Sequence, residues 1–266
     1  MRRPVLTRGV RTLGVLALGA FALGAALAVA TPARAAEEVE LRGPPGGWSF
    51  SGIFGTFNRA SAQRGFQVYR EVCSTCHGLR QVAYRNLTAL GYSMDEARAV
   101  AASAEFASLN DAGEPATRPG TPADRFASPY PNPLVARARN NGALPPDLSL
   151  MVKAREHGPN YIYSLMIGYS DPPAGVTLME GMNYNTAFPG HQIAMPPPLS
   201  ENRVTYADGT NATVAQMAQD VTTFLAWAAE PELEARHKLG VQVIIFLLLL
   251  TGILYAVKRK VWADLH

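Results

Sequence analysis

The pentapeptide CSTCH at residues 73–77 constrains this chain more than any other feature of its sequence. Its cysteines, Cys73 and Cys76, are the only two among 266 residues. A C-x-x-C pair followed directly by His is the attachment signature of a c-type haem. At this spacing both thiols reach one edge of a porphyrin and form thioethers with its vinyl groups, and the imidazole of His77 reaches the iron. We therefore expect one covalently bound haem c with His77 as an axial ligand.

Other interpretations of the cysteine pair explain fewer of these residues. A redox dithiol uses C-x-x-C within a βαβ pattern and leaves His77 without a role. A structural zinc site takes four Cys or His ligands in paired motifs, whereas this chain has only two cysteines in all. Haem attachment uses the whole motif.

Both ends of the chain carry targeting or membrane features. Residues 1–11 contain four arginines and no acid, residues 12–30 are apolar, and ARA at residues 33–35 is a small-residue cleavage site. This pattern predicts a cleaved signal peptide over residues 1–35, with an uncleaved N-terminal anchor as the alternative. Residues 239–257 carry no charge. As a helix they would extend about 28 Å, enough to cross a bilayer core.

The charges beside this apolar segment predict its orientation. Lys258, Arg259 and Lys260 follow it at once, and the positive-inside rule places them in the cytoplasm. We therefore expect a single-pass protein of the bacterial inner membrane. Its parts would be a periplasmic haem domain (36–238), a transmembrane helix (239–257) and a cytoplasmic tail (258–266).

The charge of the exported part differs from that of the whole chain. The formal net charge is +3, but residues 36–257 contain 16 Lys and Arg against 20 Asp and Glu, a net −4. A mildly acidic surface disfavours nucleic acid as a partner. It is compatible with a basic protein partner, because opposite charges speed encounter.

Helical periodicity dominates the exported part, and convincing strand patterns are few. A Pro-rich stretch at 111–133 and a stretch rich in Pro and Gly at 171–200 are predicted to be loops. Thr213 and Gln216 are expected to form a capping box. We expect helices over residues 58–73, 94–106, 148–156, 161–169 and 213–229.

The second axial ligand of the iron has two candidates by position. Met195 lies before three prolines that restrict its backbone, and a weak thioether ligand benefits from such a restraint. His191 is the rival, four residues earlier. Met151, Met166 and Met217 lie on apolar helix faces and are expected in the core.

Longer segments show that the chain resembles the cytochrome c1 family, the haem subunits of the quinol:cytochrome c oxidoreductase, or cytochrome bc1 complex. The resemblance extends from about residue 48 to residue 262. It rests on CSTCHGLR (73–80), VAYR (82–85), YPNP (130–133), NNGALPPDLS (140–149), GYSDPP (168–173), FPGHQIAMPPPL (188–199), DVTTFLAW (220–227) and KRK (258–260).

The resemblance implies a fold and site residues. The fold would be mainly α, a class I cytochrome c-like haem domain with long loop insertions and one C-terminal transmembrane helix. Met195 matches the family's distal axial ligand, ahead of His191. Arg155 and Tyr161 match positions that contact a haem propionate, and a carbonyl near Pro145 or Pro146 is expected to hold the second nitrogen of His77.

The resemblance also implies a function. The chain alone would make or break no substrate bond. As a subunit of quinol–cytochrome-c reductase, it would take one electron from the Rieske iron–sulfur protein and pass it to a soluble cytochrome c. Its partners would also include cytochrome b, within a dimeric complex. A free membrane-anchored cytochrome c feeding an oxidase is the alternative; a haem gas sensor or a thiol oxidoreductase accounts for fewer of the motifs.

Three features depart from the family pattern. His191 stands where the family pattern predicts a small or amide residue, and residues 91–125 match less well than the rest. The chain also has no further cysteine pair for the disulfide that some bacterial relatives carry.

Overall fold

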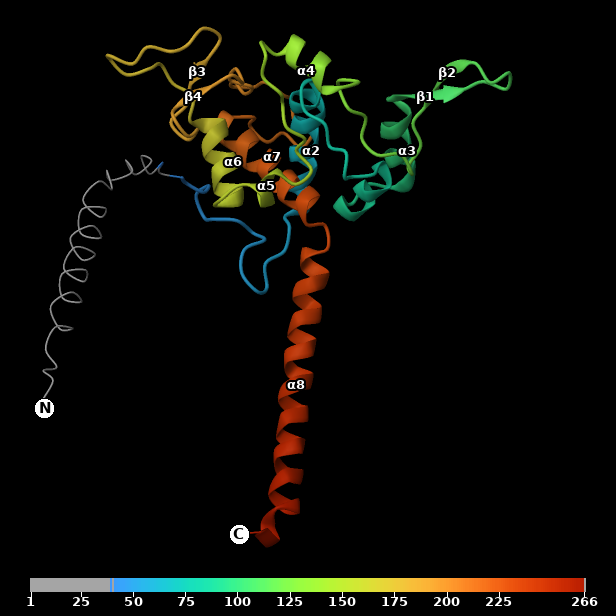
Figure 1. The fold of residues 1–266 in the computed structure, drawn as a ribbon, viewed down its shortest axis with the longest axis vertical. Coiled ribbons are helices and arrows are strands. Elements are labelled where there is room, and N and C mark those ends of the chain that lie inside the picture. Colours follow the sequence, from blue (N-terminus) through green and yellow to red (C-terminus); the bar gives the residue numbers. More distant parts are fainter. Residues whose placement is uncertain (1–38, 40, 266) are drawn as a thin grey trace, which may run out of the picture. The chain divides into compact units, whose positions relative to one another are not determined.

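A computed structural model describes Val39 and residues 41–265, so the expected signal peptide lies outside the described residues. The described part is mainly helical, as expected, with little sheet (Figure 1). Its α-helices are α2 (Arg59–Glu71), α3 (Met94–Ala102), α4 (Pro133–Arg139), α5 (Met151–Ala154), α6 (Gly158–Ile167), α7 (Val214–Ala229) and α8 (Leu233–Val261). Short 3₁₀-helices are η1 (Cys73–Thr75), η2 (Tyr84–Leu90) and η3 (Ala263–Leu265).

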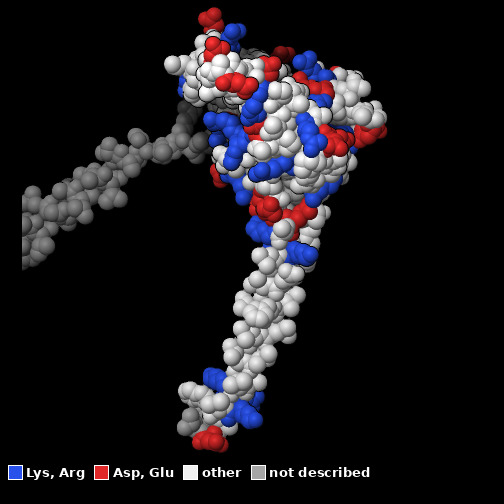
Figure 2. Space-filling model, turned by 90° about the vertical axis from the view of Figure 1, so that its right-hand side faces the viewer, with Lys and Arg blue, Asp and Glu red and all other residues white. Residues whose placement is uncertain are grey.

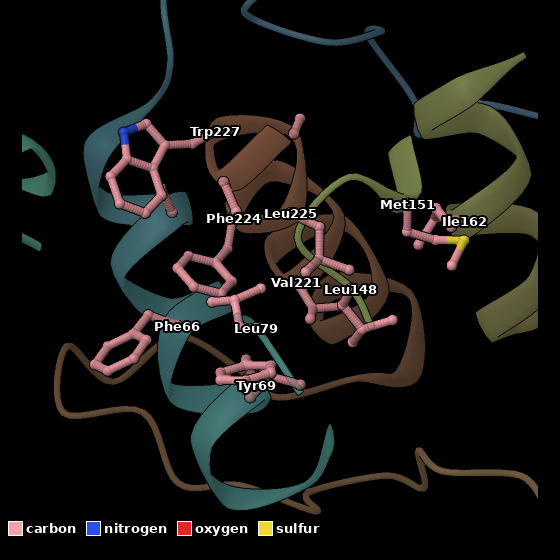
Figure 3. Packing of buried hydrophobic residues seen from close by; sticks show 14 of the residues in the cluster. Phe66, Tyr69, Leu79, Leu148, Met151, Ile162, Val221, Phe224, Leu225 and Trp227 are labelled. Carbon is pink, nitrogen blue, oxygen red and sulfur yellow. The ribbon is translucent and has the colours of Figure 1, made fainter. Parts of the chain in front are cut away.

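Helices α2 and α7 cross at the centre of the hydrophobic core (Figure 3). The rings of Phe66 and Tyr69 on α2 lie 5.5 and 5.6 Å from the ring of Phe224 on α7, between centroids. The backbones are closest at Gly65, where an added Cβ would lie 1.9 Å from the carbonyl oxygen of Asp220. The crossing therefore requires glycine at this position. Helices α5 and α6 also pack against α7.

A buried ion pair also joins α2 and α7. The Asp220 carboxylate is fully buried, and it accepts hydrogen bonds from Ser61 Oγ at 2.7 Å and from Arg64 Nε and Nη2 at 2.8 and 3.0 Å. The hydrogen bond with Asp220 raises the pKa of Arg64 above its usual value. A buried carboxylate needs such partners, because an unpaired buried charge is costly.

The start of α7 differs in one respect from the expected capping box. Thr213 Oγ1 accepts a hydrogen bond from the backbone N–H of Gln216 at 3.1 Å, which is the first half of the motif. The Gln216 side chain does not return to Thr213. The backbone N–H of Thr213 donates to the carbonyl of Asn211 at 3.0 Å instead, and Gln216 Nε2 donates to Asp220 at 3.1 Å.

Residues 105–119 form a β-hairpin, whereas the sequence predicted the end of a helix and then a loop. Helix α3 ends at Ala102, and β1 (Glu105–Leu109) pairs antiparallel with β2 (Pro115–Pro119). The Asn110 side chain accepts hydrogen bonds from the turn, and Gly113 adopts a φ of +80°. Both strands of an isolated ribbon are edges, so the prolines in β2 leave no essential donor missing.

The long segment 171–200 is mostly irregular, as expected, but it also contains a short ribbon. Strand β3 (Asn183–Tyr184) pairs antiparallel with β4 (Gln192–Ile193). An isolated bridge between Tyr169 and Asn185 joins the ribbon to the segment that follows α6. These pairings fix the backbone that leads to residues 194–199.

Helix α8 is the C-terminal apolar helix that the sequence predicted. Its 29 residues are long and apolar enough to cross a membrane. Figure 2 shows charged side chains near its two ends and a white surface between them. Glu234, in its first turn, accepts from the backbone N–H of Phe57 at 2.8 Å and forms two hydrogen bonds with Arg59, at 2.9 and 2.8 Å. The helix is thus tied to the haem-motif domain at its first turn.

Candidate functional site

The C-x-x-C-H motif forms a tight turn at the end of α2. The helix ends at Glu71, and the chain then tightens into the 3₁₀-helix η1. The carbonyl oxygen of Cys73 accepts hydrogen bonds from the backbone N–H groups of Cys76 and His77, at 3.1 and 2.9 Å. The two half-buried thiols and the imidazole of this motif therefore project from one tight turn, as the spacing predicted.

Neighbouring groups complete the backbone hydrogen bonds of this turn. Ser74 Oγ donates to the carbonyl of Arg70 at 2.7 Å, and Thr75 Oγ1 donates to that of Val72 at 2.8 Å. These carbonyls belong to the last turn of α2, which lacks intrahelical partners. Burial, with a smaller contribution from Cys76, raises the pKa of the Cys73 thiol to about 12. The thiol is therefore neutral near neutral pH and suits an apolar surface.

His77 is oriented by a carbonyl 69 residues away in the sequence. Its Nδ1 lies 2.8 Å from the carbonyl oxygen of Pro146. Burial lowers the pKa of His77, although the hydrogen bond to Pro146 opposes the shift. A neutral imidazole that donates from Nδ1 carries its lone pair on Nε2, which is the arrangement of a metal-ligating histidine. The carbonyl expected near Pro145 or Pro146 to hold the second nitrogen of His77 is that of Pro146.

The segment that presents Pro146 is held against the residues after His77. Asp147 accepts from the backbone N–H of Arg80 at 2.9 Å and from that of Ser149 at 3.0 Å. Leu148 N–H donates to the carbonyl of Gly78 at 2.9 Å, and Ser149 Oγ accepts from the backbone N–H of Gln81 at 2.9 Å. Although burial disfavours its charge, hydrogen bonds from Ser149 and Arg80 lower the pKa of Asp147.

Met195 lies just after β4, and its side chain packs against the hydrophobic core. Its carbonyl oxygen accepts from the Tyr169 hydroxyl at 3.1 Å and from Asn183 Nδ2 at 3.4 Å. With three prolines after it, the residue is restrained from both sides. The backbone that carries this half-buried thioether is therefore held in place, which favours a weak ligand.

Arg155 and Tyr161 lie close to each other. Burial raises the pKa of Tyr161, and the Arg155 guanidinium opposes that shift through charge and a side-chain hydrogen bond. Arg155 is exposed, whereas only 9% of Tyr161 is exposed. Burial, with a smaller contribution from Tyr161, also raises the pKa of Tyr169. Tyr161 thus interacts with both Arg155 and Tyr169, and Tyr169 in turn donates to the carbonyl of Met195.

His191 is turned toward its own ribbon. Its Nδ1 lies 3.2 Å from the carbonyl oxygen of Asn185, and its ring lies 5.5 Å from that of Tyr184, between centroids. Its φ of +58° is in the left-handed region.

Of the methionines assigned to the core, Met151 and Met217 are buried, and Met166 packs against the core, as expected.

The residue types present fit a c-type haem. They supply two thiols at the attachment spacing, an imidazole with a defined tautomer and a restrained thioether. The sequence did not reveal the supporting residues Tyr169, Asn183, Asp147 and Ser149. The PPDLS segment at residues 145–149 could have indicated the role of Asp147, because an Asp side chain in a turn often accepts a hydrogen bond from the backbone N–H two residues later.

Comparison with known proteins agrees with this geometry. The model of the "Cytochrome C1 family" matches residues 48–265. "Cytochrome c1" of Rhodospirillum rubrum is 52% identical over 234 residues, covering 82% of this chain and 86% of the relative. The "Cytochrome b-c1 complex catalytic subunit, mitochondrial" of Candida albicans is 49% identical over 235 residues, covering 88% and 82%. "Cytochrome c1, heme protein, mitochondrial" of Saccharomyces cerevisiae is 50% identical over 235 residues, covering 88% and 76%. With its mainly helical domain, its CSTCH turn and its apolar C-terminal helix, this chain belongs to the cytochrome c1 family.

Proposed function

We propose that this chain is the haem-bearing electron-transfer subunit of a cytochrome bc1 complex. In that role it takes one electron from the Rieske iron–sulfur protein and passes it to a soluble cytochrome c. Membership of the family supports the broader statement, an electron-transfer subunit with haem c. The observation that carries the proposal is the His77 imidazole, held through Nδ1 by Pro146 directly after two free thiols.

Six residues would hold the haem. Cys73 and Cys76 would bind it covalently, His77 and Met195 would ligate the iron, and the propionates would lie near Arg155 and Tyr161. When bound, haem supplies one iron centre that changes reversibly by a single electron. The chain keeps His77 in one tautomer, restrains the Met195 thioether and offers an always-charged guanidinium for a carboxylate.

The proposed topology has one membrane anchor. Residues 1–35 would be removed as a signal peptide, and residues 36–238 would form the periplasmic domain. Residues 239–257, within α8, would cross the bacterial inner membrane and leave residues 258–266 in the cytoplasm. The length and apolarity of α8 and the charges that follow it support this arrangement.

The proposed partners are cytochrome b, the Rieske protein and a soluble cytochrome c, with the complex as a dimer. The net charge of −4 over residues 36–257 suits a basic mobile partner and disfavours nucleic acid. Affinity purification of the full chain from membranes should recover a di-haem cytochrome b. Recovery of a terminal oxidase without cytochrome b would instead indicate a free anchored cytochrome.

The ligand assignment is tested by Met195→Leu, which keeps the size of the side chain and removes its sulfur. The reduced protein should then bind carbon monoxide, and its midpoint potential should fall, because a soft ligand that favours ferrous iron is gone. Met179→Leu is the matched control, since Met179 lies in the same long loop and is 61% exposed. An unchanged potential and spectrum in Met195→Leu would move the assignment to His191.

Covalent attachment has its own test. Denatured wild-type protein should keep its haem through acid-acetone extraction and gel electrophoresis, because thioether bonds survive both. Cys76→Ala should lose most haem incorporation. Haem that leaves the wild-type chain on denaturation would contradict the proposal.

A further inference from the structure

An exposed apolar tip lies in the loop that precedes α2. Ile53 is 67% exposed and Phe54 is 84% exposed, the highest value of any large apolar side chain among the described residues. The tip, residues 51–56, contains no charged residue. Two adjacent apolar side chains projecting from a loop are unfavourable in water, so a covering partner is expected.

The loop is built to hold this tip in place. Its ends are joined by a hydrogen bond from Thr56 N–H to the carbonyl of Ser49 at 3.0 Å. The rings of Phe50 and Phe57 are buried beneath it, with centroids 5.1 Å apart. Gly55 permits the tight path, because a Cβ there would lie 2.3 Å from the backbone of Phe50. Local folding thus exposes the tip without leaving it unsupported.

The tip lies beside the first apolar turn of α8. A cavity of about 330 Å³ is lined by residues 53–56 on one side and by residues of α8, including Val241 and Gln242, on the other. Figure 1 shows the loop before α2 descending to the level of the first turns of α8. The uncharged run of α8 begins at Leu239, so Gln242 lies about 4.5 Å along the helix into that run.

We propose that this tip is a second membrane contact, in which Ile53 and Phe54 enter the interface of the outer leaflet beside α8. The inference rests on the proposed membrane anchor and adds to it. Whatever contacts Val241 and Gln242 from outside the helix lies at membrane depth, because the spanning segment starts before them.

Lipid suits the tip better than a protein partner. The tip offers no charged group and two projecting apolar side chains, which is the chemistry of interfacial insertion. The cavity between Phe54 and Val241 has an apolar lining there, which suits an acyl chain. Lys238, which also lines the cavity and is exposed, is the last charge before the apolar run and lies where a lipid phosphate would be. A second contact, tied to α8 through Glu234, would restrict tilting of the haem domain on the membrane.

Photo-crosslinking in native membranes tests the inference on the full chain. Benzoylphenylalanine replaces one residue at a time: Phe54 at the tip, Leu247 within α8, and Leu109 in the β1–β2 hairpin. Leu109 is the matched control, because its exposure of 67% equals that of Ile53. After irradiation, mass spectrometry of the purified chain separates lipid adducts from protein adducts.

Lipid adducts at Phe54 and Leu247, at least fivefold above those at Leu109, are the expected result. Lipid at Leu247 but none at Phe54 above the Leu109 level would overturn the second contact and leave the anchor intact. A protein adduct at Phe54 would equally overturn it, by showing that the tip is a subunit interface. A Leu247 position that crosslinks neither to lipid nor to a membrane-embedded subunit would refute the anchor itself, and the second contact with it.

Discussion

Replacing Asp147 with Asn should loosen the segment that orients His77. The Asp147 carboxylate accepts hydrogen bonds from two backbone N–H groups, those of Arg80 and Ser149, at 2.9 and 3.0 Å. An amide side chain offers only one acceptor oxygen. In either orientation of the amide, one backbone N–H therefore faces an NH₂ group and loses its partner.

The magnitude follows from the burial of the groups involved. The Asp147 side chain is 18% exposed, so the lost hydrogen bond to a charged acceptor should cost about 1.5–3 kcal/mol. The ion pair with the Arg80 side chain contributes about 0–1 kcal/mol, because that side chain is 70% exposed. Together the expected loss is about 1.5–4 kcal/mol, or a Tm lower by about 3–16 °C for a domain of this size.

Thermal unfolding of the detergent-solubilised full chain, followed by circular dichroism, measures this loss. Arg80→Ala is the matched control: it removes the exposed ion pair and keeps the backbone N–H, so its Tm should fall by less than about 3 °C. Equal Tm values for Asp147→Asn and Arg80→Ala would refute the reasoning, because the backbone contacts would then contribute nothing.

The effect of Asp147→Asn on Tm should also depend on pH in a definite direction. The pKa of Asp147 is lowered in the folded protein, so its contribution is fully present above the unfolded value of about 3.9. It is lost as the pH falls through the lower folded pKa. The difference in Tm between wild type and Asp147→Asn should therefore be constant at neutral pH and narrow below about pH 4.

Three other perturbations test the fold and the topology. Gly65→Ala should lower stability by about 1–3 kcal/mol or more, because α2 and α7 must separate to admit a Cβ 1.9 Å from a carbonyl oxygen; urea unfolding measures it. Asp220→Asn should cost about 3–5 kcal/mol by leaving Arg64 without its buried partner, again by urea unfolding. A chain ended before Leu239 should be released from membranes as a soluble red protein; retention after proven removal of residues 1–35 would contradict the single anchor.

Local patterns in the sequence determined the features that depend on near neighbours. The CSTCH turn follows from five consecutive residues, and α8 follows from an uninterrupted apolar run. The expected helices also formed where caps such as Asn58 and Thr213 act within one turn, whereas the uncapped helix expected over residues 148–156 is only Met151–Ala154. The β1–β2 hairpin was missed because its prolines excluded helix but did not exclude an edge ribbon.

Contacts between distant residues were decided only by the tertiary structure. Pro146 reaches His77 across 69 residues, and Tyr169 holds the carbonyl of Met195 across 26. Family resemblance limited the carbonyl that accepts from His77 to that of Pro145 or Pro146. No sequence spacing predicts that the Asp147 side chain holds this segment in place. Met195 as the ligand stays a prediction. Sequence spacing encodes which side chains share a turn or a helix face, whereas packing of whole helices decides which turns meet.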